Sequence, residues 1–549
     1  MNRSVGRPIA VALVAVVAAA GVAIVGSAVL GGGASGRAAS APRFVEEASA
    51  AGIDHTFGGQ DQWFVGGGVA VFDCDGDRRP DLYLAGGEGP ALLARNESEV
   101  GGSLRFTPVH DPVTDLSNVT GAYPLDVDGD AVADLAVLRR GETVLLRGLG
   151  DCRFERANEQ WGFDGGDGWT TAFSATWEGA STRPTLALGR YLDLEKTTDS
   201  TYVCDHNELF RPASDGTYGP PTALQPGFCT LSILFSDWDR SGRRDLRVSN
   251  DRHYYQDGRE QLWRIEPGQP PREYTEADGW QHMELWGMGI ASQDLTGDAY
   301  PEVYLTSQGD NKLQTLADGP AHPHYRDIAL ERGVTATRPF AGDTTLPSTA
   351  WHPQFEDVNN DGFIDLFVAK GNVYEMPDYA RRDPSNLLLG QADGTFIEGA
   401  QEAGIMSFDR GRGAAVADLN LDGLLDIIQV NFGAPVQMWR SIGSGAPDNP
   451  AMGHWLGVQL SEPGANRDAI GSWIEVKSGD TTIERELTIG GGHVSGRLGP
   501  THFGLGSADG AEVRVTWPDG EQGPWIPVEA DQYVTLDRGA DAVTPWSVP

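Results

Sequence analysis

The sequence predicts an all-β protein, a seven-bladed β-propeller followed by a small β-rich domain, and three observations lead to that fold class. Short acidic segments recur along most of the chain, each beside strand-like apolar runs. With 72 glycines and 33 prolines, the composition is that of many short strands joined by tight turns. At 549 residues the chain is too long for one compact core unless a repeat spreads the fold along it. Long helices are therefore expected to be scarce.

Six nine-residue segments carry side-chain oxygens at positions 1, 3, 5 and 9, and they define the repeat. An apolar run of strand type follows each segment, and a Gly/Ala-rich strand precedes most of them, so the predicted unit is strand, acidic loop, strand. The segments are DCDGDRRPD from Asp73, DVDGDAVAD from Asp126, DWDRSGRRD from Asp237, DLTGDAYPE from Asp294, DVNNDGFID from Asp357 and DLNLDGLLD from Asp418.

A seventh unit lies in the gap between Asp126 and Asp237, which is about twice as long as the other gaps. There TRPTLALGR aligns with RRPDLYLAG of the first unit, while the oxygen positions fall on Trp177, Gly179, Ser181 and Thr185. Seven units of four short strands predict a seven-bladed propeller, whose radial repetition leaves only short sheet edges. Aromatic-led segments between the loops are interpreted as a recurring connector between blades; they begin at Phe44, Phe154, Tyr274, Tyr325 and Phe396.

The spacing of the oxygens predicts calcium sites. Oxygens at positions 1, 3, 5 and 9, with a backbone carbonyl at 7, supply the hard shell of about six to eight oxygen ligands that Ca²⁺ prefers. Zinc favours nitrogen and sulfur, and magnesium demands tighter octahedral geometry. We therefore predict Ca²⁺ as the cofactor, with up to six ions. The predicted ligands are Asp73, Asp75, Asp77 and Asp81; Asp126, Asp128, Asp130 and Asp134; Asp237, Asp239, Ser241 and Asp245; Asp294, Thr296, Asp298 and Glu302; Asp357, Asn359, Asp361 and Asp365; and Asp418, Asn420, Asp422 and Asp426.

An EF-hand begins with the same spacing but would place helices around each loop. It also needs a glutamate at position 12, where these segments have Leu84, Val137, Val248, Leu305, Val368 and Gln429. We therefore expect loops of the hairpin type. Ser241 weakens the third loop, and Thr296 with Glu302 makes the fourth unusual. The alternative, acidic turns without a metal, is most open for these two loops.

The chain is strongly acidic, with a formal net charge of −37 from 78 acidic and 41 basic residues. This balance argues against nucleic acid, because phosphate binding needs clustered lysine and arginine. The negative charge favours cations over nucleic acid as binding partners. The alternative is that the acidic residues only keep the protein soluble.

The N-terminus reads as an export signal: Arg3 and Arg7 precede the uncharged apolar run from Ile9 to Leu30. This run is long enough to cross the roughly 30 Å hydrocarbon core of a bilayer as a helix. Residues 1–41 are therefore a signal peptide or an N-terminal transmembrane anchor plus linker, and Pro42 after the Ala-x-Ala at Ala39 favours the anchor. The remainder is expected to be extracellular or at the cell surface, tethered if the segment is uncleaved.

All four cysteines lie in the exported part, where disulfides are chemically reasonable. Cys204 and Cys229 bracket a Pro/Gly-rich insertion without strand alternation, so we expect them to pair, which leaves Cys74 with Cys152. Buried free thiols are the alternative.

The loops resemble the FG-GAP or VCBS-like repeats of integrin α-chain propellers, and we place the propeller at residues 42–445. The segment from Asn466 to Gln522 resembles the ASPIC/UnbV domain in its AIG turn, GGG-x-x-S, HFGLG and WPDG sequences, and we place that domain at residues 450–538. The combination is similar to the cartilage acidic protein 1 family, including its bacterial members. The resemblance implies a secreted or surface calcium-binding propeller with a β-rich cap and no established catalytic activity.

Three function classes stay open. The leading one is an extracellular binding or adhesion module, in which calcium stiffens one rim while the opposite rim, or the C-terminal domain, meets an unknown protein or glycan. A carbohydrate-active enzyme, a glycosidase or lyase, is the second, with candidates Asp251, His253, Tyr254, Tyr255, His282 and Glu284. We predict no catalytic residue, because a carboxylate in so acidic a chain is more often surface or a calcium ligand.

The third class is a purely structural envelope protein. Tryptophans in the blade connections weakly disfavour it, since they could stack on a ligand, although packing between blades uses the same residues. They are Trp63, Trp161, Trp169, Trp263, Trp280, Trp286 and Trp351.

Overall fold

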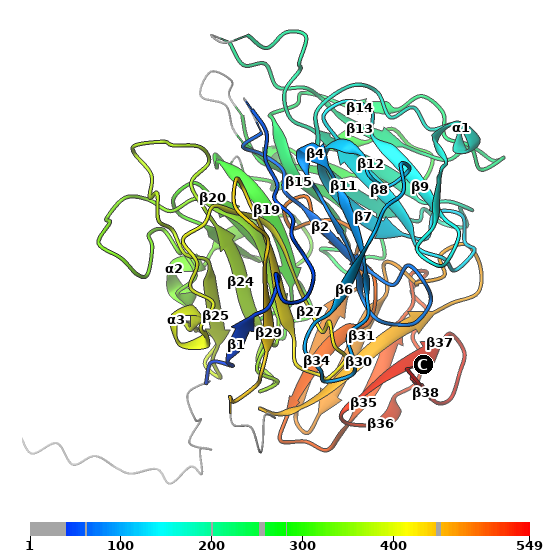
Figure 1. The fold of residues 1–549 in the computed structure, drawn as a ribbon. Helices are drawn as coiled ribbons and strands as arrows, with labels where there is room; N and C mark the ends of the chain where they lie inside the picture. The colour runs from blue at the N-terminus through cyan, green and yellow to red at the C-terminus, as the bar shows by residue number, and fades with distance from the viewer. Residues whose placement is uncertain are drawn as a thin grey trace, which may run out of the picture. The chain divides into compact units, whose positions relative to one another are not determined.

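Short β-strands carry almost all of the regular structure (Figure 1). The computed structural model describes residues 40–60, 63–198, 201–251, 258–281, 283–445 and 452–548. Its helices are single turns, namely α1 (Asn158–Trp161), α2 (Ala329–Arg332), α3 (Ala400–Ala403) and the 3₁₀ turn η1 (Glu276–Asp278). The predicted all-β fold class is confirmed.

Seven sheets of one design are formed by the described residues up to 441, each with sequential antiparallel strands. Their strands are β2 (Val69–Phe72), β3 (Asp81–Leu84), β5 (Leu92–Asn96) and β6 (Phe106–Val109); β7 (Ser117–Leu125), β8 (Asp134–Arg139), β9 (Val144–Gly148) and β10 (Phe154–Arg156); β11 (Thr170–Thr176), β12 (Thr185–Arg190), β13 (Asn207–Phe210) and β14 (Thr222–Leu224); β15 (Thr230–Ser236), β16 (Asp245–Asn250), β17 (Gln261–Arg264) and β18 (Arg272–Glu273); β19 (Gly287–Gln293), β20 (Glu302–Ser307), β21 (Lys312–Leu316) and β22 (Tyr325–Asp327); β23 (Ala350–Glu356), β24 (Asp365–Lys370), β25 (Asn386–Gly390) and β26 (Phe396–Glu398); and β27 (Gly411–Ala417), β28 (Asp426–Asn431) and β29 (Gln437–Ser441) with β1 (Phe44–Glu46). A short extra strand, β4 (Gly87–Pro90), pairs with β7.

The first strands of these sheets contact one another in order around a closed ring, from β2 through β7, β11, β15, β19, β23 and β27 back to β2. The last sheet takes its outermost strand from the other end of the propeller, because β1 pairs with β29 and places Phe44 opposite Ser441. This pairing joins the two ends of the ring, as a β-propeller requires.

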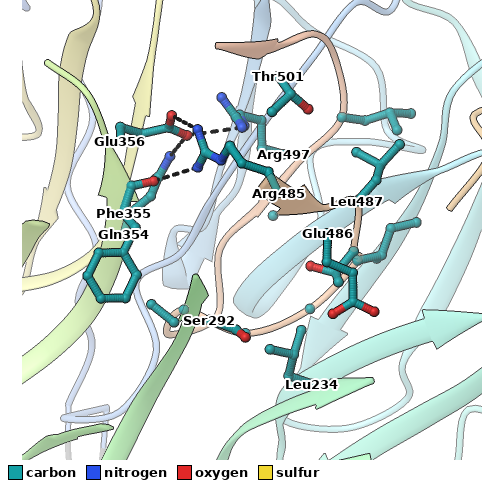
Figure 2. A pocket seen from close by; sticks show the side chains of 18 of the residues that line it. Leu234, Ser292, Gln354, Phe355, Glu356, Arg485, Glu486, Leu487, Arg497 and Thr501 are labelled. Carbon is teal, nitrogen blue, oxygen red and sulfur yellow. Dashed lines mark hydrogen bonds and ion pairs between the residues drawn. The ribbon is translucent and has the colours of Figure 1, made fainter. Parts of the chain in front are cut away.

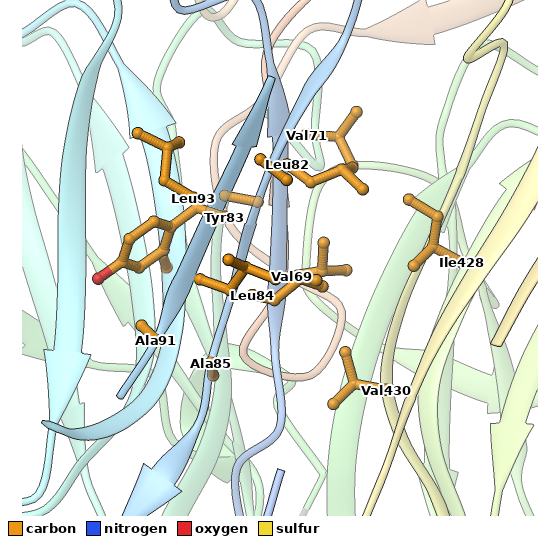
Figure 3. Close-up of a cluster of buried hydrophobic side chains, with 14 of the residues drawn as sticks. Val69, Val71, Leu82, Tyr83, Leu84, Ala85, Ala91, Leu93, Ile428 and Val430 are labelled. Atoms are coloured by element: carbon orange, nitrogen blue, oxygen red, sulfur yellow. The ribbon is translucent and has the colours of Figure 1, made fainter. Parts of the chain in front are cut away.

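Apolar runs at the predicted strand positions build the core between neighbouring blades. Figure 3 shows this packing between the first and last blades, where Val69 and Leu84 of the first lie in one cluster with Ile428 and Val430 of the last. All four side chains are almost fully buried. Burying each such side chain contributes about 1.5–3 kcal/mol, so the hydrophobic strands themselves hold the blades together.

The aromatic-led segments are not simply connectors, which corrects the sequence interpretation. Phe44, Phe154, Tyr325 and Phe396 each begin the outermost strand of a blade, and a single helical turn follows the last three. The aromatic ring is buried in each case. These outer strands have only three residues, too few for their alternation to be recognised in the sequence.

Both predicted disulfides are present, Cys204–Cys229 and Cys74–Cys152. The reading of residues 204–229 as an insertion without strands is wrong, because this segment contains β13 and β14, the outer strands of the third blade. These strands have four and three residues, again too short for a visible alternation.

The C-terminal domain has two four-stranded sheets. One contains β34 (Thr501–Gly506), β30 (His454–Ser461), β37 (Gln532–Asp537) and β38 (Thr544–Pro545), and the other β32 (Thr481–Glu486), β31 (Trp473–Ser478), β35 (Gly510–Thr516) and β36 (Ile526–Glu529). Their apolar faces share one core, which includes Leu456, Ile474, Phe503 and Val513.

The predicted signal or anchor, residues 1–41, falls almost wholly on residues 1–39, outside the described part of the chain. Among the described residues, no helix is both long enough and apolar enough to cross a membrane.

Candidate metal loops

All six acidic segments connect the first strand of a blade to its second strand. Because adjacent strands of a blade are antiparallel and the blades repeat around the ring, the six loops lie on one rim, which we call the loop rim. Each loop is named here by its first residue. A strand follows every loop, so the hairpin interpretation is confirmed and the EF-hand is excluded.

The six loops share one backbone conformation. Positions 4 and 6 have positive φ in each of them, as at Gly76 and Arg78 or at Leu421 and Gly423. At a residue other than glycine this conformation costs of the order of 1 kcal/mol, so other interactions must fix it. The full set of such pairs is Gly76 and Arg78, Gly129 and Ala131, Arg240 and Gly242, Gly297 and Ala299, Asn360 and Gly362, and Leu421 and Gly423.

The carboxylate at position 1 supplies that fixation. Asp73 accepts the amide of Gly76 at 2.7 Å on Oδ1 and the amide of Arg78 at 2.8 Å on Oδ2. Asp418 does the same with the amides of Asp422 at 3.1 Å and Gly423 at 2.6 Å. The loop therefore wraps around its first carboxylate, which turns the oxygens at positions 3 and 5 toward one another.

The acid at position 9 is almost fully buried in every set. Asp81 accepts the amides of Cys74 at 2.8 Å and Asn96 at 2.7 Å, the latter from the third strand of the blade. The pKa of Asp81 is raised to about 8. Burial and the charges of Asp75 and Asp73 raise this pKa, and the hydrogen bonds from the two amides lower it. The pKa of Asp134 is raised to about 8 by the same causes in the Asp126 loop. A bound cation would relieve this concentration of negative charge.

Orphaned oxygens at position 3 provide a test of whether the loops fit a metal. Asn420 is only 1% exposed, and its Oδ1 has no hydrogen-bond partner among the described residues. Asp128 Oδ1 is likewise buried and unpartnered, although Arg147 Nε donates to its other oxygen at 2.6 Å. An unpaired oxygen inside a loop of carboxylates is the donor that Ca²⁺ uses.

Two loops bring three carboxylates within 4.8 Å of one another; these are Asp73, Asp75 and Asp81, and Asp126, Asp128 and Asp134. The Asp357 loop shares the backbone of the Asp418 loop and the hydrogen bonds to its first carboxylate, with Asp357 accepting the amides of Asp361 and Gly362. The residues of the Asp73, Asp126, Asp357 and Asp418 loops therefore fit a calcium ion.

The Asp237 loop contains a cation of its own. Arg243 at position 7 donates to Asp245 Oδ1 at 2.9 Å and to Asp239 Oδ2 at 3.1 Å. Tyr274 and Trp238 also donate to Asp245 Oδ2, at 2.8 and 2.9 Å. A guanidinium thus neutralises the carboxylates that a metal would need, and this loop does not fit an ion as it stands.

The Asp294 loop is intermediate. Glu302 at position 9 accepts the Thr315 hydroxyl at 2.7 Å and the Leu295 amide at 2.8 Å, and Thr296 replaces a carboxylate at position 3. In the blade without a loop, Glu178 accepts Arg211 Nε and the Thr185 hydroxyl, both at 2.7 Å. There an ion pair within the chain takes the place of a metal site.

A recurring arginine on the third strand escaped the sequence analysis. One residue of the third strand pairs with the first residue after the nine-residue segment, and the arginine comes next in the sequence. In the first blade Ala94 pairs with Leu82, and Arg95 follows Ala94. Arg95 contacts Asp75 at 3.2 Å, and Arg147 contacts Asp128 and Asp130. The sequence contains a signal for this arginine. The third strands include LLAR, LLRG, LWRI and MWRS, and their arginines occupy the same register in different blades; they are Arg95, Arg147, Arg264 and Arg440.

The C-terminal domain covers the loop rim. Tyr533 donates its hydroxyl hydrogen to Asp418 Oδ2 at 2.5 Å, and His502 Nε2 lies 2.6 Å from Asn360 Oδ1. Arg244 of the Asp237 loop donates to the carbonyl of Gly471 at 3.0 Å and to that of Pro518 at 2.7 Å. Tyr533 of the C-terminal domain thus contacts a predicted ligand, Asp418, and the other contacts lie beside the predicted ligands.

The C-terminal domain also inserts residues 489–497, which we call the channel segment, among the first strands of the blades. Ile489 pairs with Ala175 of β11, Gly490 with Leu234 of β15 and Gly492 with Ile290 of β19. Its end, β33 (Gly496–Arg497), runs parallel to β2. A Cβ at Gly490 would lie 2.5 Å from Ser174 Oγ, so the glycine run is needed for this approach.

A buried ion triad holds the channel segment beside a cavity of about 180 Å³ (Figure 2). Glu356 of β23 contacts Arg485 at 2.5 Å and Arg497 at 3.1 Å. Burial raises the pKa of Glu356, but the two guanidiniums outweigh it, so the pKa is lowered overall.

The residues considered for catalysis are only partly described. His253, Tyr254, Tyr255 and His282 lie outside the described residues. Asp251 accepts the Tyr191 hydroxyl at 2.7 Å, and burial raises its pKa to about 6. Six of the seven tryptophans singled out in the sequence are buried, as packing requires; they are Trp63, Trp161, Trp169, Trp263, Trp280 and Trp351.

Comparison with known proteins agrees with the two-part organisation. A family model described as ASPIC and UnbV matches residues 462–543, and one described as FG-GAP-like repeat matches residues 73–137 and 357–428. The second matches span the four loops that fit calcium.

Cartilage acidic protein 1 of Xenopus tropicalis is 22% identical over 502 residues, which cover 83% of this chain and 70% of that protein. The proteins of the same name from Mus musculus and Homo sapiens are 27% and 39% identical over 161 residues, which span 23% and 22% of those proteins. The family resemblance seen in the sequence is confirmed.

Solved structures give weaker likenesses. The structure of BBS1N in complex with ARL6DN has a TM-score of 0.40 at 11% identity and covers 70% of this chain and 94% of that one. An Agrocybe aegerita lectin has a TM-score of 0.37 at 16% identity and covers 66% and 88%. At these scores no argument is drawn from them.

Proposed function

From a chain that joins FG-GAP-like repeats to an ASPIC and UnbV segment, we propose an exported calcium-binding module that presents one propeller rim to an extracellular protein or glycan. The repeats, the two disulfides and the relation to cartilage acidic protein 1 are those of an extracellular-type β-propeller protein. Calcium, the partner and the absence of catalysis are the parts proposed.

One observation carries the calcium proposal. In the Asp418 and Asp126 loops a buried oxygen at position 3, Asn420 Oδ1 or Asp128 Oδ1, has no hydrogen-bond donor among the described residues. Leaving such oxygens unpaired costs about 1–3 kcal/mol each. Calcium would pair these two oxygens, and in the Asp73, Asp126, Asp357 and Asp418 loops it would neutralise the clustered carboxylates.

We propose that the partner binds the opposite rim, because the C-terminal domain covers the loop rim and occupies the channel. The connections from second to third strands and from one blade to the next lie on that opposite rim. Tyr374, in the connection between β24 and β25, is 62% exposed there. The role is binding rather than catalysis, since the carboxylates clustered on the loop rim already hold loop backbone.

Thermal unfolding tests the calcium proposal. The full-length protein is melted in EDTA, then with millimolar Ca²⁺ or Mg²⁺, and its metal content is measured by mass spectrometry. Ca²⁺ is expected to raise the Tm strongly and Mg²⁺ weakly, since each site stabilises by about 3 kcal/mol at 100-fold excess over Kd. Sodium chloride at equal ionic strength controls for screening. An unchanged Tm with no bound metal contradicts the proposal.

Glycan and extracellular-protein arrays, probed with the calcium-loaded protein, test the placement of the partner. Tyr374→Ala should weaken any specific signal about tenfold, as removal of an exposed aromatic anchor does. Ile397→Ala, at a 43% exposed residue on the outermost strand β26, is the matched control and should leave the signal unchanged. Equal loss with both variants would exclude the opposite rim as the specific surface.

A further inference from the structure

The Asp418 loop is sealed by aromatic side chains of the C-terminal domain. Tyr533 of β37 donates to Asp418 Oδ2, the oxygen that also accepts the Gly423 amide. Its ring lies 4.7 Å from that of Trp455 and 5.1 Å from that of Trp546, measured between centroids. Any Cβ at Gly423 would collide with the Trp455 indole. Position 6 of this loop is therefore shaped to receive the C-terminal domain.

Tyr533 binds one of the two carboxylate oxygens of Asp418, namely Oδ2. With two donors on Oδ2, the carboxylate is held so that Oδ1 remains on the side of Asp422, whose amide it accepts. On that side lies Asn420, whose buried Oδ1 has no partner among the described residues. The tyrosine thus orients a predicted ligand from outside the loop, as outer-shell hydrogen bonds do at metal sites.

A second contact of this kind occurs at the Asp126 loop. The turn that precedes the AIG sequence of the C-terminal domain brings Ala465 against Gly129, where a Cβ would lie 3.1 Å from the Ala465 Cα. Asp468 from the same turn lines a cavity of about 330 Å³ together with Asp126. No described residue donates a hydrogen bond to the Asp468 carboxylate. Burial and the charge of Asp126 raise the pKa of Asp468 to about 7, while Arg467 lowers it.

The Asp237 loop shows how the same interface is built where no metal fits. Glu486 of the C-terminal domain accepts the Asp237 amide at 2.8 Å and the Ser236 hydroxyl at 2.7 Å. Arg240 lies 3.9 Å from the centre of the Trp473 ring. Asp237 Oδ1 has no hydrogen-bond partner among the described residues, but Arg243 neutralises the neighbouring carboxylates Asp239 and Asp245. At the Asp126 loop the docking carboxylate of Asp468 instead lines a cavity that Asp126 also lines.

We infer that the C-terminal domain completes the metal sites of the Asp418 and Asp126 loops, with Tyr533 positioning Asp418 and Asp468 adding a ligand beside Asp126. Metal binding and docking of this domain are then coupled, since residues of both domains contribute to each site. This inference rests on the proposed calcium binding. By linkage, the ion must strengthen docking by the same factor by which docking strengthens ion binding.

Native mass spectrometry of the full-length protein at graded free Ca²⁺ tests the inference. Asp468→Asn and Tyr533→Phe should each weaken one ion about 10- to 100-fold, so that one ion fewer is bound where the wild type is just saturated. Asp480→Asn removes the same charge at an exposed turn of the same domain and should keep the full count. An unchanged count in both test variants overturns the inference.

Hydrogen exchange of the channel segment gives an independent readout on the unaltered protein. Amides of residues 489–497 should exchange at least about tenfold more slowly with Ca²⁺ than with EDTA, because docking buries them. If the wild type binds calcium but this protection does not respond, the coupling is wrong and the proposed function stands. If no calcium binds, both are overturned.

Discussion

The Asp418 and Asp237 loops have the same backbone but different sources of positive charge. Both wrap around a first carboxylate and both use positive φ at positions 4 and 6. In the Asp237 loop Arg243 donates to the carboxylates from within, whereas in the Asp418 loop the corresponding residue is Leu424 and an oxygen of Asn420 stays unpaired. The comparison teaches that the shared backbone does not decide whether a loop takes a metal; the balance between its carboxylates and the cations that pack against them does.

The third-strand arginines also form different ion pairs although they occupy the same register. Arg440, at the register of Arg95 and Arg147, contacts Glu47 at 2.9 Å instead of a loop carboxylate. This ion pair keeps the guanidinium of Arg440 engaged outside the Asp418 loop. Which charges meet is thus set by neighbours that are distant in sequence.

Removing the guanidinium of Arg243 should have the largest effect on stability, and it would remove the difference between the Asp237 and Asp418 loops. Arg243→Met leaves Asp239 and the buried Asp245 without their counter-charge, so the free energy of unfolding in EDTA should fall by about 3–5 kcal/mol. Urea denaturation measures this change. Ca²⁺ should restore part of the stability and add one ion to the native mass spectrum, because the loop now offers free carboxylates.

Arg105→Met is the matched control, since Arg105 is mostly exposed and pairs with Glu97 at the surface. It should change stability by less than about 1 kcal/mol. A loss in Arg243→Met no larger than in this control would show that the guanidinium does not substitute for a metal.

A smaller effect on stability is expected from pH, and it tests the protonation of the acids in the loops that fit calcium. Burial and Asp422 raise the pKa of Asp418 to about 7, although hydrogen bonds to it act the other way, and Asp81 and Asp134 titrate near 8. These acids bind protons more tightly when folded, so their contribution to stability is present below about pH 4 and is lost as the pH rises to 8.

In EDTA the Tm is therefore expected to fall between pH 5 and about 8, and saturating Ca²⁺ should flatten or reverse that slope because the ion replaces the protons. Thermal scans at constant ionic strength measure both curves. Asp418→Asn should reduce the slope in EDTA. A Tm in EDTA that rises across this range would contradict the assignment of raised pKa values to these acids.

The sequence by itself determined the repeating unit, because strand alternation, turn residues and the spacing of oxygens are all local. It placed all six loops, the degenerate seventh unit and the C-terminal domain, and it supported the pairing of Cys204 with Cys229. Short outer strands escaped it, since three residues such as those of β10 carry too little pattern.

Only the tertiary structure decided what surrounds the oxygens. Arg243 lies inside a loop that looked merely weakened by Ser241, Tyr533 reaches Asp418 from more than a hundred residues away, and the channel segment fills the ring. The physical reason is that local sequence fixes backbone conformation, while the charge balance of a buried site depends on every group that packing brings to it.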